Sequence, residues 1–173
     1  MTAKCLKGLW LLMPLLLVGC DFSRMTVSCH EHIAAGDTGR YVVKDSGIVL
    51  DPDTGVEWYR CAFGQRHTLR GCTGDALLVT YDEVDSMLEE ISTKAGQQWR
   101  LPTESEFLAL KEPQCHVPAM NTNVFPNPLI DNFWVQGERE RANKACAVYT
   151  YNLGRSCRLL GNDPRPFYMV KGG

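Results

Sequence analysis

The stretch Trp99-Arg100-Leu101-Pro102-Thr103-Glu104-Ser105-Glu106-Phe107-Leu108-Ala109-Leu110 carries the strongest structural signal in this chain. Thr103 and Glu106 have the spacing of a capping box, in which each side chain accepts a hydrogen bond from the other residue's backbone N–H. Apolar residues on one side of the helix follow at Phe107, Leu108 and Leu110. Because Pro113 cannot continue a helix, we predict a short helix that begins at Thr103 and ends before this proline.

A longer helix is predicted upstream by the same kind of start signal. Thr80 and Glu83 form a second capping box. Apolar residues then recur at i, i+3, i+4 and i+7, which places them on one face of a helix; they are Val84, Met87, Leu88 and Ile91. Gly96 is suited to end this helix because glycine readily adopts the left-handed conformation of a C-cap.

The rest of the chain favours short strands and loops. β-branched runs and alternating segments predict strands at 41–43, 48–50, 56–61, 133–135, 145–151, 158–160 and 167–170. Turn signals lie at 45–47 and 51–55, and residues 62–71 are expected to form a polar loop. Residues 118–131 are rich in Asn and Pro and predict a long loop. Strands, two helices, a loop and further strands indicate one α+β domain.

The N-terminus has the pattern of an export signal. Lys4 and Lys7 precede an apolar run at 9–18, which is too short for the roughly 20 residues that span a bilayer. The run ends in Leu17-Val18-Gly19-Cys20, which resembles the bacterial lipobox. We therefore expect residues 1–19 to be a lipoprotein signal peptide. The alternatives are an ordinary signal peptide with a chance cysteine and a retained signal anchor.

In this interpretation Cys20 becomes the lipidated N-terminus of the mature protein, and residues 20–38 form a tether. Several acyl chains, palmitate among them, would anchor the protein stably where a single chain is marginal. Asp21 follows directly and resembles the signal that retains lipoproteins in the inner membrane of enteric-type bacteria. The predicted location is the bacterial cell envelope, at the inner membrane and facing the periplasm.

The cysteines predict a disulfide-bonded domain. Six remain after the leader and the lipidated residue: Cys29, Cys61, Cys72, Cys115, Cys146 and Cys157. Six cysteines allow 15 pairings, and sequence alone does not select one. Two pairs are local, because Cys61 and Cys72 flank a polar loop and Cys146 and Cys157 flank a predicted hairpin with its turn at 152–154. Cys29 and Cys115 are then left as a long-range pair, while a zinc site lacks any C-x-x-C spacing.

The charge pattern of the chain argues against nucleic acid as a partner. The chain has 18 Lys and Arg against 20 Asp and Glu. It contains no basic stripe and no interleaving of basic and aromatic residues, so nucleic acid is not expected as a partner.

Five segments together resemble one known family. They are 53–58 (DTGVEW), 99–110 (WRLPTESEFLAL), 121–126 (NTNVFP), 133–134 (FW) and 167–172 (FYMVKG). In this order they resemble the Lcl C-terminal domain family, whose fold is similar to C-type lectins and the formylglycine-generating enzyme. The resemblance covers 39–173 and implies a C-type-lectin-like domain with two helices packed on short antiparallel sheets. Val135, Met169 and Lys171 depart from the family pattern.

The motif residues are expected to act mainly as scaffold. Trp58, Trp99 and Trp134 offer large apolar surfaces for a small core. Arg100 is placed to bind carbonyls or a carboxylate beneath the start of the second helix. The cysteine pair of the copper-dependent relatives has no counterpart here, and the triplets that bind sugar through calcium in C-type lectins are absent.

We expect a non-catalytic domain without a cofactor or bound metal, which binds a protein or glycan partner in the envelope. Its recognition surface is predicted on the loops 118–131 and 136–144, with Asn127, Arg139 and Arg141 as candidate binding residues. Two alternatives stay open. One is a metal-dependent enzyme with a site near His30, His32 and His116, and the other is a structural subunit of an envelope complex.

Overall fold

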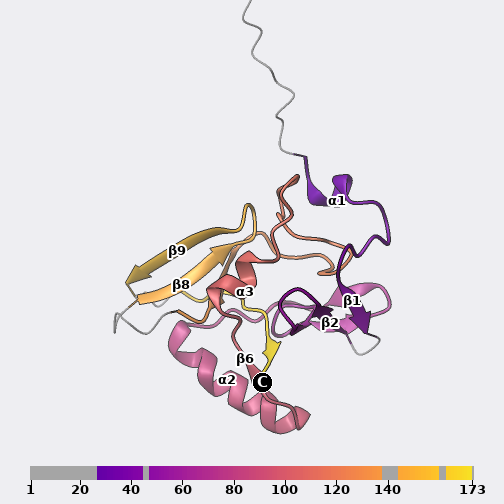
Figure 1. Cartoon of the computed structure of the whole chain (residues 1–173). Helices are drawn as coiled ribbons and strands as arrows, with labels where there is room; N and C mark the ends of the chain where they lie inside the picture. The colour runs from indigo at the N-terminus through magenta and orange to yellow at the C-terminus, as the bar shows by residue number, and fades with distance from the viewer. Residues whose placement is uncertain (1–26, 45–46, 138–143, 160–162, 173) are drawn as a thin grey trace, which may run out of the picture.

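The computed structural model describes residues 27–44, 47–137, 144–159 and 163–172. Within these residues, helices combine with three small antiparallel sheets, so the predicted α+β class is confirmed. Figure 1 shows α1 at one end of the domain, with α2 and the C-terminus at the opposite end. Cys20, Asp21, Arg139 and Arg141 lie outside the described residues.

The largest sheet has five short strands in the order β1-β2-β3-β10-β6. Their bounds are Val42–Lys44, Ile48–Asp51, Val56–Tyr59, Val170–Lys171 and Trp99–Arg100. Every pair in this sheet is antiparallel. The C-terminal strand β10 therefore lies between β3 and β6, so the end of the chain pairs with a strand from its first half and a strand from its middle.

Two smaller sheets complete the fold. One is the hairpin of β4 (Arg66–Thr68) and β5 (Gly71–Thr73). The other has the order β7-β8-β9, with bounds Asn132–Val135, Lys144–Tyr149 and Gly154–Leu159. The long β8–β9 hairpin projects to one side of the domain (Figure 1).

Both predicted helices form, and each begins at its capping box. In α2 (Tyr81–Ala95), the Glu83 carboxylate accepts from the Thr80 backbone N–H at 2.8 Å, and Gly96 ends the helix in the left-handed conformation. In α3 (Glu104–Leu108), Glu106 and Thr103 cap each other reciprocally. No helix in the described part of the chain is both long and apolar enough to cross a membrane.

The core consists of two aromatic clusters. Trp58 is fully buried and makes edge-to-face contacts with Phe107 and Phe125, both at 5.9 Å between ring centroids. The second cluster surrounds Trp134, whose indole N–H donates to the Val79 carbonyl, and it receives the apolar face of α2. The tryptophans thus serve as scaffold, as the sequence indicates.

Three disulfides bond the described cysteines. The pairs are Cys29–Cys115, Cys61–Cys72 and Cys146–Cys157, which are the pairs favoured by the sequence. Cys146 and Cys157 face each other directly in the β8–β9 register. The Cys29–Cys115 bond joins residues 86 positions apart and fixes α1 (Cys29–His32) to the body of the domain.

The predicted strand pattern is wrong in several places. Residues 62–71 contain β4 and the start of β5, where we expected a polar loop, because short strands built from Arg, His, Thr and Gly show no apolar alternation. The strand expected at 158–160 instead begins at Gly154, directly after the hairpin turn. The last strand is reduced to Val170–Lys171, and Phe167 makes only an isolated bridge to Trp134.

Candidate functional site

A groove of about 500 Å³ lies between the β4–β5 hairpin, the end of β1 and residues 122–126. Four of its lining residues are basic in type: Lys44, Arg60, His67 and Arg70. Val43 and Leu69 add apolar surface. None of the described residues that line the groove is Asp or Glu, but Lys44 pairs with Glu57 outside it. The positive charge that the groove offers a ligand therefore comes from Arg60 and Arg70.

Arg60 is the most buried cation of the groove. It follows β3 and is only 9% exposed. Its guanidinium donates to the carbonyls of Val124 at 2.7 Å and Asn123 at 2.6 Å, and it contacts the imidazole of His67. Among the described residues, no carboxylate forms a salt bridge with it. Burial lowers the pKa of Arg60, but a guanidinium stays charged at neutral pH.

His67 lies beside this guanidinium, on β4. Its Nε2 is 3.2 Å from Nη1 of Arg60, so Nε2 is the acceptor and the proton of the neutral ring lies on Nδ1. Burial lowers the pKa of His67, and the charge of Arg60 lowers it further. The imidazole is therefore neutral at pH 7 and orients Arg60 without adding charge.

The walls of the groove are held together covalently and by close packing. The Cys61–Cys72 disulfide ties the residue after Arg60 to β5. Gly71 has a φ of +108°, and a Cβ at this position would come within 3.0 Å of the Pro126 ring. A side chain at Gly71 would therefore separate the hairpin from residues 122–126 and widen the groove.

The Asn-rich loop behind the groove mostly satisfies its own surroundings. The Asn121 side chain accepts from the backbone N–H of Asn123 and donates to the Asp37 carbonyl. The Asn123 side chain donates to the carbonyls of Ala34 and Asp37. These contacts fix the loop and use both ends of the Asn121 amide and the amide nitrogen of Asn123. Asn127 differs, because it is exposed and its amide lies near Gly71 at the edge of the groove.

A second hollow of about 620 Å³ is lined by charges that are already paired. Arg100 forms a bidentate ion pair with Glu106, at 2.7 and 2.8 Å, and also donates to the Leu101 carbonyl. This contact confirms the role expected for Arg100. Glu57 binds both Lys171 and Lys44, and these hydrogen bonds lower the pKa of Glu57. The hollow therefore presents no free charge of either sign among these residues.

The histidines of the metal alternative do not converge. His30 and His32 are exposed on α1, where His32 contacts the Gln114 side chain at 3.1 Å. His116 is partly buried, and its backbone pairs with residues on either side of Ser28. These three histidines do not form a group with ligand atoms within 4.8 Å of one another in the part of the chain that the structure describes.

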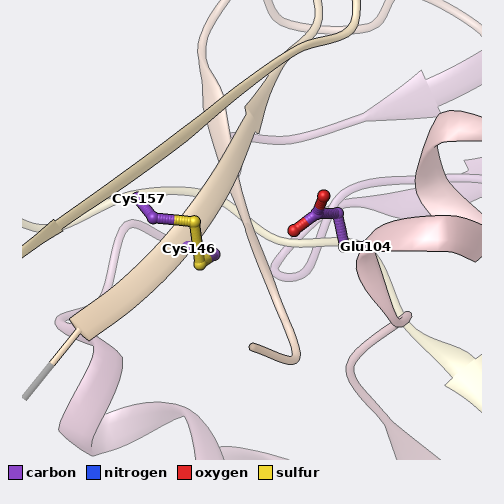
Figure 2. Close-up of side chains that lie close together, drawn as sticks. All are labelled: Glu104, Cys146 and Cys157. Atoms are coloured by element: carbon purple, nitrogen blue, oxygen red, sulfur yellow. A yellow bond between two sulfur atoms is a disulfide. The ribbon is translucent and has the colours of Figure 1, made fainter. Parts of the chain in front are cut away.

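One group of ligand types does meet that distance in the same part of the chain. Figure 2 shows the Glu104 carboxylate directed toward Cys146 and Cys157. Both sulfurs are consumed in the disulfide, and the carboxylate binds Arg155 at 2.8 Å. These atoms therefore have other partners and do not make a metal centre in this oxidised form.

The sequence analysis does not predict Arg60 as a site residue. Residues two apart on a strand point to the same face, so Arg60 lies on the face that buries Trp58. An arginine at this position of the sequence indicates a buried guanidinium, which needs hydrogen-bond partners inside the fold. Leu69 and Arg70 carried no such signal, because they form the turn of a hairpin that the sequence pattern does not predict.

Comparison with known proteins identifies the domain type. A family model described as the Lcl C-terminal domain matches residues 47–165, which is more than half of the 173-residue chain. No curated protein and no solved structure matches the chain.

Proposed function

Because the chain belongs to the Lcl C-terminal domain family, we propose that it is a lipid-anchored envelope protein whose non-catalytic domain binds a negatively charged group on a protein or glycan partner. The observation that carries this proposal is the basic groove, above all the buried guanidinium of Arg60, which forms no salt bridge with a carboxylate of the described residues. A buried charge is stabilised by an opposite charge, which an anionic ligand supplies. The small antiparallel sheets, the helices α2 and α3 and the three disulfides are consistent with the C-type-lectin-like arrangement that we propose.

Arg70 is the residue with which to test the groove. It is exposed at the hairpin turn, and none of the described residues forms a salt bridge with it. Arg60 is less suitable, because its loss would also release residues 123 and 124. Arg66 is the matched control, since it is exposed on the same hairpin but does not line the groove.

The experiment is capture of partners from native membranes, followed by mass spectrometry of what co-purifies. Arg70→Ala should weaken capture, whereas Arg66→Ala should not. Capture should also decrease as salt is added, because salt screens exposed charges over about 10 Å at 0.1 M. Equal capture by both variants would refute the groove as the binding site. Asn127→Ala should weaken capture as well, since this amide borders the groove.

The remaining expected binding residues, Arg139 and Arg141, are tested in the same assay. Loss of capture in Arg139→Ala or Arg141→Ala, with Arg70→Ala unaffected, would move the binding surface to the loop 136–144. Metal analysis of the purified protein separates the enzyme alternative, because a stoichiometric metal would favour the histidine site. Co-purification of a fixed multiprotein complex, insensitive to all these variants, would favour a structural subunit.

Lipid anchoring has its own test. Cys20→Ala should block processing of the signal peptide and abolish lipid attachment, which metabolic labelling with a fatty acid detects. Asp21→Ser should shift the protein from the inner to the outer membrane fraction. Normal processing and lipid labelling of Cys20→Ala would contradict the lipoprotein assignment.

A further inference from the structure

A group of apolar side chains is exposed at the end of the domain that carries α1. Val27, Leu129, Ile130 and Tyr151 are 43%, 38%, 40% and 37% exposed, respectively. We call these four residues the tether-side patch. α1 and the turn between β8 and β9 lie at this end, away from α2 and the C-terminus (Figure 1).

Backbone pairing brings the members of the patch together. The Thr150 N–H donates to the Asp131 carbonyl at 3.0 Å, which continues the β7–β8 pairing past Asn132 and Tyr149. Ile130 therefore lies level with Tyr151 across this extension. The Thr150 hydroxyl also donates to the Leu129 carbonyl at 2.6 Å, which holds Leu129 beside Ile130 in the patch.

The first described residue joins the patch through the segment around Val117. The Val117 N–H donates to the Tyr151 carbonyl, and the His116 N–H donates to the Val27 carbonyl, both at 2.9 Å. The segment His116–Val117 therefore lies between Val27 and Tyr151 and bonds to the backbone of both. The same segment is held by the Cys29–Cys115 disulfide, so the patch is a fixed part of the domain.

The place of Cys20 in the sequence indicates what covers this patch. Cys20 precedes Val27 by seven residues, and seven fully extended residues span at most about 25 Å. A lipid anchor at Cys20 would therefore keep this end of the domain near the membrane at all times. Tyrosine suits that place, because its ring is apolar and its hydroxyl is polar, and it is enriched at membrane interfaces.

We propose that the tether-side patch rests on the phospholipid surface in which Cys20 is anchored, with Tyr151 at headgroup level. The inference depends on the proposed lipidation of Cys20. It adds an orientation to the domain, because a seven-residue tether keeps this end near the membrane but does not by itself decide which side chains touch the lipid.

Photolabelling tests this orientation. The full-length lipidated protein is reconstituted in vesicles of phosphatidylethanolamine and phosphatidylglycerol that contain a diazirine-bearing phospholipid, and labelled peptides are mapped by mass spectrometry. Peptides with Leu129, Ile130 and Tyr151 should carry the label. Leu69 is the internal control, because it is fully exposed on the β4–β5 hairpin and should stay unlabelled. Labelling of Leu69 as strong as that of Tyr151 would overturn the proposal.

Variants separate contact from mere exposure. The double variant Leu129→Ser, Ile130→Ser should lose most of the labelling at Tyr151, whereas Leu77→Ser, which removes a leucine that is 45% exposed, should not change it. Unchanged labelling of Tyr151 in the double variant would also overturn the proposal. Equal urea midpoints show that the variants fold alike, as expected for exposed positions.

The same preparation distinguishes failure of the orientation from failure of the lipoprotein assignment. Protein that washes off the vesicles is not lipid-anchored, which refutes the lipidation at Cys20 and this inference with it. Protein that stays on the vesicles and is labelled at Leu69 instead refutes the orientation alone.

Discussion

The substitution Asp51→Asn should destabilise the domain strongly, although it changes a single charge at nearly constant size. Asp51 ends β2 and is 1% exposed. Its two carboxylate oxygens accept from Nε and Nη2 of Arg40 at 2.9 and 3.0 Å. Removing one partner of a buried ion pair destabilises the fold strongly, and Arg40 would keep only the exposed carboxylate of Asp53 as a counter-charge.

The magnitude follows from these contacts. Loss of one partner of a fully buried pair costs about 3–5 kcal/mol. The Arg40 side chain is 33% exposed and keeps its hydrogen bonds to the Tyr41 hydroxyl and the Ala109 carbonyl. We therefore expect a loss at or below the lower limit of this range, about 2–3 kcal/mol. For a domain of this size the melting temperature should fall by roughly 5–10 °C.

Asp53→Asn is the matched control. Asp53 also contacts Arg40, at 3.2 Å, but its side chain is 72% exposed. An exposed ion pair contributes at most about 1 kcal/mol, so this variant should unfold close to wild type. The assay is urea unfolding followed by tryptophan fluorescence. A loss in Asp53→Asn as large as that in Asp51→Asn would refute the role assigned to burial.

The difference between wild type and Asp51→Asn should also depend on pH. Burial is the largest single effect and raises the pKa of Asp51. The hydrogen bonds from Arg40, the Asp53 N–H and Thr54, together with the charge of Arg40, outweigh burial and hold the folded pKa below its ordinary value. The stabilisation is therefore complete above the unfolded pKa of about 3.9 and is lost as the pH falls through the folded pKa. The two proteins should become similar in stability at low pH. A difference that stays constant from pH 7 into this acidic range would contradict the explanation.

Two further predictions concern covalent and helix-capping contacts. Changing both Cys29 and Cys115 to serine should cost about 4–5 kcal/mol, because this disulfide closes a loop of 86 residues; a shift below about 1 kcal/mol in urea unfolding would contradict that account. Glu106→Gln should lower the unfolding free energy by about 1–2 kcal/mol, since Glu106 both caps α3 and binds an arginine. Glu83→Gln is the control, because Glu83 caps α2 but forms no salt bridge with an arginine of the described residues. It should lower the unfolding free energy less than Glu106→Gln does. A larger loss in Glu83→Gln would show that Arg100 contributes nothing.

The helices were predictable because their signals are local. A capping box fixes the start of a helix within four residues, and the apolar spacing of α2 marks its buried face. Val84 and Leu88 are buried as predicted, and Met87 and Ile91 pack against the same cluster. The local disulfides were predictable for a related reason, because two cysteines on either side of a turn have few other partners within reach.

The groove was not predictable, because it depends on contacts between segments far apart in the chain. Arg60 and Asn123 are 63 residues apart, and the hairpin that faces them has no hydrophobic pattern. The loop 118–131 was expected to offer its amides to a partner. The structure instead uses Asn121 and Asn123 to hold the segment around Asp37, a long-range contact that composition does not reveal.

The Cys29–Cys115 bond also determines how mechanical force enters the domain. Tension applied to the N-terminal end of the chain reaches Cys29 and passes through the two sulfur atoms directly to Cys115. The segment between α1 and β1 is thereby bypassed, and pulling cannot peel it from the body residue by residue. Resistance then rests on the covalent bond and on the packing around Cys115, which is 1% exposed. Tension on the N-terminus therefore enters the domain at Cys115, and does not enter the five-stranded sheet through its edge strand β1.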